Sequence, residues 1–204
     1  MINKKPFGKI KCKTIKEGHN PVCIITVKNK RNILGIELSS GKYILKNMKK
    51  EEISNKDIKL LKSLSNLKLI PKIYLIDEKY IVMDYFNGMT LSKYLYNYTL
   101  SKNLYLTIKK LIHKWHKLGY AHGDLALLFA NKNNKLVGAD NLLIGRNNSI
   151  ILIDPTIGKI TDSDNDKLSQ FDLKKKYDLE FLKELEFYVD NPLSDVLKLS
   201  KGDI

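Results

Sequence analysis

The sequence predicts an α+β protein in two parts, the first rich in strands and the second mainly helical. Short β-branched runs separated by polar turns dominate residues 20–85, with one helical pattern among them. Longer stretches with helical periodicity follow after Phe86-Asn87-Gly88, which breaks the pattern. We therefore expect a single domain over residues 1–204 with two lobes, residues 1–87 and 88–204.

Composition favours a folded protein outside the membrane. Hydrophobic residues make up 43% of the chain and charged residues 28%, as in ordinary globular proteins. No apolar run approaches the roughly 18 residues of a membrane span, and the basic N-terminus lacks the apolar core of a signal peptide. Cys12 and Cys23 are too few for a disulfide framework. We therefore expect a reducing cytoplasm, either of the producing cell or of a host cell after secretion.

The net charge of +14 is unevenly placed along the chain. Residues 1–50 contain thirteen Lys and Arg but only two acids, Glu17 and Glu37. Such a basic surface attracts polyanions, among them nucleotide phosphates, nucleic acid and anionic lipid. No basic stretch is interleaved with aromatic residues, so nucleic acid is not favoured as a partner. Contact with an anionic surface stays open, as does the oligomeric state.

The first part is predicted to contain three strands, a helix and two more strands. The strands are expected at residues 22–27, 33–38, 42–46, 73–76 and 80–85. The helix begins at Ser54, with Asp57 in its first turn. In strand 42–46, Tyr43 and Leu45 share one face and Lys46 lies on the other. Lys46 is therefore either a solvated strand residue or a lysine that reaches into a cleft.

The second part is predicted to contain helices at residues 90–98, 104–118 and 172–189. Between the last two, three polar residues lie at the ends of apolar runs: Asp124, Asn141 and Asp154. An apolar run that ends in a polar residue is how a buried element delivers that side chain to a cleft. Two carboxylates and a carboxamide suit chemistry on a magnesium-bound polyphosphate.

These residues occur in the order in which the protein-kinase-like superfamily carries its motifs. His122-Gly123-Asp124-Leu125 resembles the catalytic loop of that family. Asn141-Leu142-Leu143-Ile144 resembles its metal-binding asparagine with the following strand, and Ile153-Asp154 its second metal-binding acid. Upstream, Tyr43-Ile44-Leu45-Lys46 resembles the lysine strand, and Val82-Met83-Asp84-Tyr85-Phe86-Asn87-Gly88 the hinge. The resemblance spans about residues 20–185.

The resemblance implies a two-lobed kinase-like fold, with an antiparallel sheet and one helix in the N-lobe and a reduced, mainly helical C-lobe. It also implies a reaction that uses ATP and magnesium. By this resemblance Asp124 orients the acceptor hydroxyl and takes its proton, and Asn141 and Asp154 hold magnesium through oxygen ligands. Lys46 holds the nucleotide phosphates and is itself fixed by Asp57, or else by Glu51 or Glu52.

Further roles follow from the same resemblance. The hinge residues that contact the nucleotide are Met83, Asp84 and Tyr85. His122 braces the catalytic loop, and Asp178 either braces the backbone of that loop or is a solvated helix acid. His113 and His116 are given no chemical role, and Trp115 is expected in the core.

The chain departs from the family pattern in four ways. Residues 28–32 stand where a glycine-rich phosphate loop is expected. Asn141 follows Asp124 by 17 residues, whereas the family spacing is roughly five. The excess, residues 126–138, must loop out unless Asn131 is the metal ligand. Asp154-Pro155-Thr156 replaces Asp-Phe-Gly, and no Ala-Pro-Glu motif follows.

These departures indicate a minimal kinase, similar to compact effector, RIO-like or lipopolysaccharide kinases. The first expectation is a protein kinase that phosphorylates Ser or Thr hydroxyls. The alternative is a kinase that acts on a lipopolysaccharide sugar or another small-molecule hydroxyl. A third possibility is a pseudokinase or a basic binding module, because the phosphate-loop glycines are missing and the catalytic loop is stretched.

Overall fold

The computed structural model describes residues 11–16, 21–48, 54–125, 127–130, 135–154 and 169–192. The chain divides into two compact units, Met1–Phe86 and Asn87–Ile204. The division falls within the Phe86-Asn87-Gly88 stretch that was expected to separate the lobes. The protein is of the α+β class, with an antiparallel sheet and four α-helices among the described residues. None of these helices is long and apolar enough to cross a membrane.

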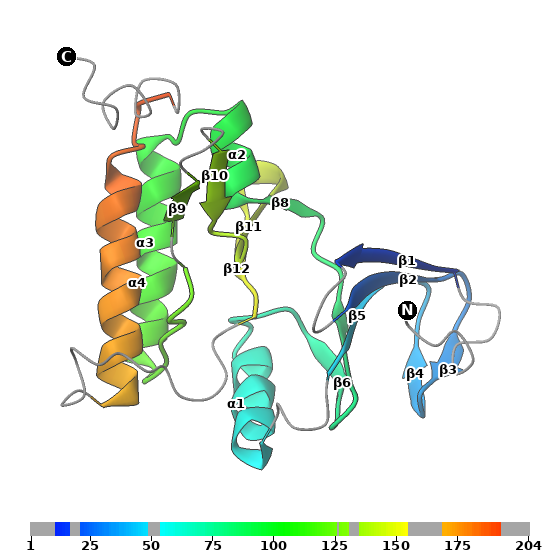
Figure 1. Cartoon of the computed structure of the whole chain (residues 1–204). Coiled ribbons are helices and arrows are strands. Elements are labelled where there is room, and N and C mark those ends of the chain that lie inside the picture. The colour runs from blue at the N-terminus through cyan, green and yellow to red at the C-terminus, as the bar shows by residue number, and fades with distance from the viewer. Residues whose placement is uncertain are drawn as a thin grey trace. The chain divides into compact units, whose positions relative to one another are not determined.

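The first unit is built on a five-stranded sheet whose neighbouring strands all pair antiparallel (Figure 1). The strand order is β1-β2-β5-β7-β6, and helix α1 (Asn55–Asn66) joins β5 to β6 along the chain. Four strands occur where the sequence predicts them, and β1 is additional. The bounds are β1 Lys11–Lys16, β2 Val22–Val27, β5 Gly41–Asn47, β6 Ile73–Ile76 and β7 Tyr80–Asp84.

One face of this sheet carries the apolar core of the unit. On β5, Tyr43 and Leu45 are buried, and Lys46 lies on the opposite, more accessible face. The predicted period of two is therefore confirmed for this strand. The buried residues that pack with Tyr43 and Leu45 are Cys23, Ile25, Val27, Ile33, Leu38 and Val82.

The sequence prediction of one strand over residues 33–38 is wrong. The structure has a tight hairpin there, made of β3 (Arg31–Ile33) and β4 (Ile36–Leu38). Leu34 and Gly35 form the turn with φ angles of 54° and 82°, and Gly35 N donates to Asn32 Oδ1 at 3.0 Å. A two-residue turn with both φ angles positive matches the twist of a hairpin. The chain therefore reverses inside what reads as one apolar run.

Strand β1 was also not expected, since residues 1–20 show no clear periodicity. It pairs with β2 at the edge of the sheet, and its lysine-rich sequence suits an edge that must not pair further. With β1 in place, the segment that connects the first two strands of the sheet is residues 17–21, of which 17–20 lie outside the described residues. Residues 28–32 instead belong to the connection from β2 into β3.

Cys12 and Cys23 form a disulfide between β1 and β2, with their Cα atoms 6.1 Å apart. The sequence predicted no disulfide, because two cysteines do not make a framework. The antiparallel register brings the two cysteines together, because it places Cys12 opposite Ile25 and Thr14 opposite Cys23. The two cysteines are thus diagonal neighbours on adjacent strands, close enough to be bridged.

In the second unit, α3 (Lys102–Lys117) and α4 (Gln170–Glu186) lie side by side and antiparallel (Figure 1). A bridge between Leu100 and Val189 ties the start of α3 to the end of α4. Both helices were predicted from apolar periodicity, with ends that differ by a few residues. Their buried apolar side chains are Leu104, Tyr105, Ile108, Ile112, Trp115, Leu173, Phe181, Leu182 and Leu185.

A small antiparallel sheet completes the frame of the second unit. It contains β8 (Gly88–Thr90), β11 (Leu142–Gly145) and β12 (Ile150–Leu152), in the order β12-β11-β8. Helix α2 (Leu91–Asn97) follows β8 directly and is capped by the side chain of Thr90. Asn141 immediately precedes β11, and Asp154 follows β12 by two residues.

Two short strands between Asp124 and Asn141 form a β-hairpin. β9 (Leu127–Ala130) pairs with β10 (Lys135–Gly138), with Leu127 opposite Gly138. The residues just outside this pair, Leu125 and Ala139, are both buried. The chain therefore leaves and returns at one place, so that the 17 residues from Asp124 to Asn141 do not separate them in space.

Candidate active site

Asp124 and Asn141 are in direct contact in the second unit. The side-chain Nδ2 of Asn141 donates to the backbone carbonyl of Asp124 at 2.9 Å and to its Oδ2 at 2.8 Å. These two bonds fix the rotamer of Asn141 against the loop and leave Oδ1 of the carboxamide directed elsewhere. The hairpin therefore brings together two of the residues predicted for the site, Asp124 and Asn141.

Asp154 enters the same region through the β11–β12 ladder. Leu142 pairs with Leu152, and one step further Ile153 N donates to Asn141 O at 2.8 Å. Asp154 is the next residue, so its backbone starts at the end of the ladder where Asn141 lies. Its φ of 48° is in the left-handed region, which is costly for a residue other than glycine. Such a conformation persists only where the surrounding structure imposes it.

The backbone of the His-Gly-Asp segment is held by a buried carboxylate. Asp178 on α4 is 1% exposed, and its Oδ2 and Oδ1 accept from His122 N and Gly123 N, each at 2.8 Å. Gly123 has a φ of 75°, which favours glycine at this position. Of the two roles considered for Asp178, the structure supports the brace of the loop backbone and not the solvated helix acid.

A third donor to Asp178 is a residue to which the sequence assigned no role. Nε2 of His116, near the end of α3, lies 3.0 Å from Asp178 Oδ2, and both side chains are almost fully buried. Three donors therefore surround one buried carboxylate, as a buried charge requires. The only signal in the sequence was a second histidine six residues before His122, and its significance depends on the packing of α3 against α4.

His122 links the loop to the strand that carries Asp154. It is fully buried, and its Nε2 lies 2.7 Å from Ile153 O while its Nδ1 accepts from Asp124 N at 3.3 Å. Since the carbonyl can only accept, Nε2 carries the proton and Nδ1 is free to accept. Burial lowers the pKa of His122, against the opposing effects of the Ile153 carbonyl and of the carboxylates of Asp178, Asp124 and Asp154. His122 is thus a neutral brace, as predicted.

The donor set of the second unit fits a magnesium ion that is also bound by phosphate. Among the described residues, no three His, Cys, Asp or Glu side chains form a group that could hold a metal ion. Magnesium in nucleotide sites commonly takes only one or two protein oxygens, with phosphates and water as its other ligands. Asn141 and Asp154 offer one carboxamide oxygen and a carboxylate, which is sufficient for that mode of binding.

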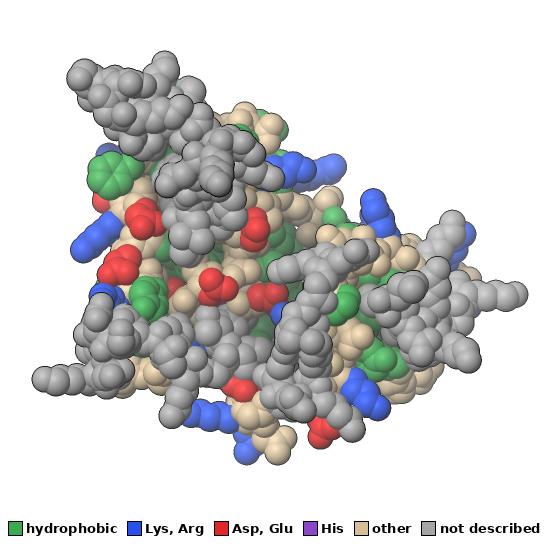
Figure 2. Space-filling view, viewed as in Figure 1, with side chains coloured by type: hydrophobic (Ala, Val, Ile, Leu, Met, Phe, Trp, Pro, Cys, Tyr) green, Lys and Arg blue, Asp and Glu red, His purple; other side chains and the backbone are tan. Residues whose placement is uncertain are grey.

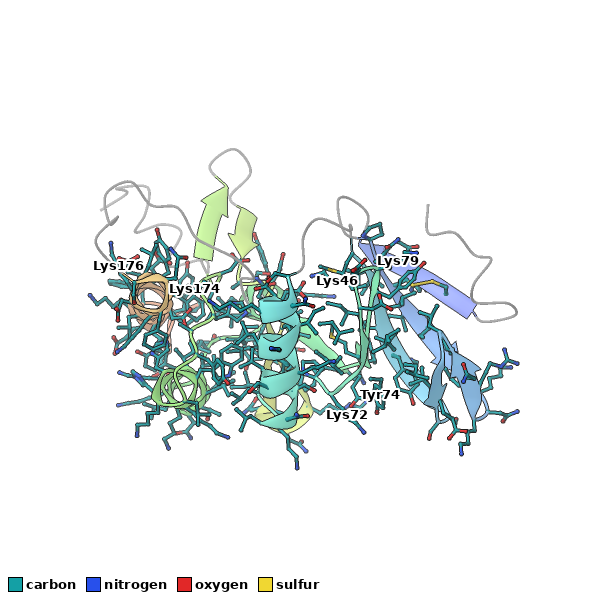
Figure 3. The ribbon with its side chains drawn as sticks, turned by 90° about the horizontal axis from the view of Figure 1, so that it is seen from below. Lys46, Lys72, Tyr74, Lys79, Lys174 and Lys176 are labelled. Carbon is teal, nitrogen blue, oxygen red and sulfur yellow. A yellow bond between two sulfur atoms is a disulfide. The ribbon has the colours of Figure 1, made fainter. Side chains whose placement is uncertain are left out.

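The residues expected to bind the nucleotide belong to the first unit. Lys46 lies on β5, opposite Val22 on β2 and Ile81 on β7, and its side chain is partly accessible (Figure 3). Met83 and Asp84 are on β7, where they pair with Ile44 and Tyr43. The main chain thus places these candidates on two adjacent strands at the centre of the sheet.

The residues expected to form the hinge are held by local contacts. Tyr85 N donates to Lys42 O at 3.4 Å, which extends the pairing of β5 and β7 up to the unit boundary. The Tyr74 hydroxyl donates to Asp84 Oδ1 at 2.9 Å, and Lys72 lies over the ring of Tyr74 (Figure 3). Burial, together with this hydrogen bond, raises the pKa of Tyr74 to about 12, so it stays a donor.

The side chain of Asp57 forms hydrogen bonds at the start of α1. Its Oδ2 accepts from Ser54 N at 3.0 Å, and Ser54 Oγ accepts from Asp57 N at 3.2 Å, which together form a capping box. The predicted helix start is therefore confirmed. The choice between Asp57 and the other candidate partners of Lys46 stays open, because Glu51 and Glu52 lie outside the described residues. Asn131, the alternative metal ligand, lies outside them as well.

Two sequence comparisons provide no family assignment for this chain. A scan against models of protein families gave no match, and a search of curated protein sequences gave no relative. Any functional assignment therefore depends on the chemistry of the site itself.

Proposed function

We propose that the protein is an ATP- and magnesium-dependent phosphotransferase of the protein-kinase-like superfamily that phosphorylates Ser or Thr hydroxyls of a protein. The observation that supports this best is the bonded set in the second unit. Asp124 is paired with Asn141, and its loop is held by Asp178 and by His122. Arrangements that position one accessible carboxylate with this many buried contacts suit catalysis, where positioning supplies much of the rate.

In the proposed reaction Asp124 accepts a hydrogen bond from the acceptor hydroxyl and aims its oxygen at the terminal phosphorus of ATP. The new bond joins the acceptor oxygen to that phosphorus, the bond to the β-phosphate oxygen breaks, and the hydroxyl proton passes to the carboxylate. A carboxylate of ordinary basicity is sufficient to accept this proton, because the transition state for phosphoryl transfer is loose. Asn141 fixes the rotamer of Asp124 through the 2.8 Å bond to Oδ2.

The cofactor roles follow from the donor types. Asn141 and Asp154 would hold magnesium, which neutralises charge on the phosphates when bound. Lys46 would bind the α- and β-phosphates, and the hinge residues Met83, Asp84 and Tyr85 the base.

The experiment compares label transfer from ATP by the wild type with that by Asp124→Ala and Asp154→Ala. We expect each change to lower transfer to protein acceptors by at least about 100-fold, which is typical for loss of a positioned acid or base. Glu180→Ala, an exposed carboxylate on α4, is the matched control and should retain wild-type activity. Transfer that survives both Asp124→Ala and Asp154→Ala would contradict the proposal.

The acceptor class has one alternative, a sugar or other small-molecule hydroxyl. The short stretch of chain between Asp154 and α4, which begins at Gln170, favours it. A peptide-docking activation segment has little room in so few residues. Screening protein, glycolipid and aminoglycoside acceptors against the same ATP turnover decides between the classes. Transfer to proteins alone would exclude the alternative.

A binding module without catalysis is tested separately, by thermal unfolding with magnesium and ATP. Ligand at 100 times its dissociation constant stabilises the folded state by about 2.7 kcal/mol. We expect a shift of the unfolding midpoint that requires magnesium and is weakened in Lys46→Met. The absence of any shift at high nucleotide concentration would favour the binding module.

A further inference from the structure

The outer face of α3 carries a continuous stripe of basic and apolar side chains. Leu106, Lys110, Lys114, Lys117 and Leu118 are all exposed, and we call them the α3 stripe. At the α-helical repeat they fall within an arc of about 120° and extend over about 18 Å. The buried face of α3, which includes Ile108, Ile112 and Trp115, lies on the opposite side of the helix. The stripe therefore belongs to the face of α3 that packing leaves free, which also carries Asn103 and Thr107.

Helix α3 itself carries no acidic residue. α3 contains five lysines, two histidines and no aspartate or glutamate, whereas α4 contains four lysines and five acids. Within the described part of the chain, Lys110, Lys114 and Lys117 have no carboxylate within salt-bridge distance. The face of the molecule in Figure 2 carries acidic and basic side chains together, which is the ordinary pattern of a soluble surface. α3 departs from that pattern.

The neighbourhood of the stripe adds to its positive potential. Burial lowers the pKa of His113, and so do His116 and three lysines, Lys109 and Lys117 of α3 and Lys175 of α4. Positive charge from two helices therefore acts on one imidazole. In Figure 3, which views α3 along its axis, nitrogen-tipped side chains spread from the side of the helix away from α4.

Two features of the α3 stripe indicate what kind of partner would bind it. Leu106 and Leu118 are 39% and 43% exposed, one near each end of the stripe. Leucines flanking lysines suit the interface of an anionic membrane, where apolar side chains enter the acyl boundary and lysines meet the head groups. The cations are all lysine, and the whole chain contains only Arg31 and Arg146. Paired hydrogen bonding to nucleic-acid bases and phosphates favours arginine instead.

We propose that the α3 stripe docks the protein on an anionic lipid surface. The helix would lie along the surface, with Lys110, Lys114 and Lys117 over the head groups and the two leucines inserted. The opposite charges of stripe and lipid select this occupant, and the exposed leucines add the apolar contact that electrostatic attraction alone lacks. The inference does not depend on catalysis, so it can fail while the proposed phosphotransferase activity stands.

The test is co-sedimentation of the full chain with vesicles of phosphatidylcholine, with and without about one-third phosphatidylserine. We expect binding only to the anionic vesicles, and binding that weakens as salt is raised because the charges are exposed. Lys110→Gln, Lys114→Gln and Lys117→Gln together should weaken the partition coefficient on the order of 100-fold, at roughly fivefold for each lysine. Leu106→Gln with Leu118→Gln should weaken binding without changing its salt dependence.

The matched control replaces three exposed lysines of another helix, Lys56→Gln, Lys59→Gln and Lys62→Gln of α1. It removes the same charge and should leave the partition coefficient nearly unchanged. Circular dichroism verifies that both triple variants stay folded. Equal loss in the control and the stripe variant would overturn the assignment, as would binding to neutral vesicles alone. Failure to bind anionic vesicles would also overturn it, and stripe-dependent binding to an RNA homopolymer or to polyglutamate would then assign the surface a different anionic partner.

Discussion

The two units hold their candidate residues by different means. In the second unit, Asp178, His116 and His122 are buried polar groups that bond one another or the main chain of the loop carrying Asp124. In the first unit, Lys46 and Asp84 lie on strands whose positions are set by an apolar core. Removing one partner from a buried polar network leaves the others unpaired, which is costlier than losing one surface contact.

This difference predicts at which positions a single substitution has the largest effect on stability or activity. The geometry of the loop that carries Asp124 in the second unit depends on very few side chains. The geometry of the strands that carry Lys46 and Asp84 in the first unit depends on many apolar contacts, each of which contributes a little. The predictions below test this contrast, beginning with the largest expected effect.

Replacement of Asp178 should have the largest effect. Asp178→Ala removes the acceptor of His122 N, Gly123 N and His116 Nε2. We expect the free energy of unfolding of the second unit to fall by about 3 to 5 kcal/mol. Trp115, the single tryptophan, is buried in that unit, so its fluorescence during urea unfolding is the measurement.

Glu180→Ala on the same helix is the control. Its partner Lys176 is 3.9 Å away and both side chains are exposed to solvent, so the change should alter stability by less than about 0.5 kcal/mol. If the two variants unfolded at the same urea concentration, the buried brace would not stabilise the unit. The contrast between the units would then lose its main support.

Reduction of the disulfide should act on the first unit. The cysteines are 11 residues apart in sequence, and for a loop of this length the chain-entropy model gives about 3 kcal/mol. We expect reductant to increase amide hydrogen exchange in β1 and β2 and to leave the exchange of α3 unchanged. Cys12→Ala should mimic the reduced protein and be insensitive to reductant. Free thiols in air-oxidised protein, measured by alkylation and mass spectrometry, would contradict the pairing.

Acidification should destabilise the second unit through His122. Burial keeps the pKa of His122 in the folded state below its ordinary value. The unfolded chain therefore binds more protons below about pH 6.5, and stability falls with pH from there by up to about 1.4 kcal/mol per pH unit. The pKa of His113 is also lowered, so the measurement uses a His113→Gln background. A flat urea midpoint between pH 7.5 and 5.5 would contradict a lowered pKa of His122 in the folded state.

The prediction with the smallest expected effect tests whether Asp57 only caps α1 or also fixes Lys46. Ser54→Ala and Asp57→Ala both break the capping box of α1 and should each cost about 1 kcal/mol. If Asp57 also fixes Lys46, only Asp57→Ala should raise the KM for ATP. An equal KM in both variants would transfer that role to Glu51 or Glu52. Ser101→Ala, which removes a cap of α3, provides the baseline for a cap without a nearby acid.

Local chemistry predicts much of the fold. The start of α1 follows from Ser54 and Asp57, and the spans of α2, α3 and α4 follow from apolar periodicity. The same period rules fail at Gly35, where a glycine turn splits an apolar run into β3 and β4. They also fail at β1, because an edge strand shields little of its surface and so has no apolar signature.

In the candidate site, too, the residues could be predicted from the local sequence, whereas their contacts could not. Asp124, Asn141 and Asp154 can be found from the sequence because each follows or precedes an apolar run. The contact between Asp124 and Asn141 cannot, since it depends on the β9–β10 hairpin that closes the 17-residue excursion. His116 could not be assigned a role for the same reason, because its partner lies 62 residues away on α4.

The sequence by itself determined which side chains are chemically suited to the site and which face of each strand or helix is apolar. Both depend on residue type and on short periods, which operate within a few neighbouring residues. Only the tertiary structure decided that Asp178 is a buried brace, that Cys12 meets Cys23, and that Leu127–Ala130 pairs with Lys135–Gly138. Those outcomes depend on pairing between distant segments, whose register is fixed by packing.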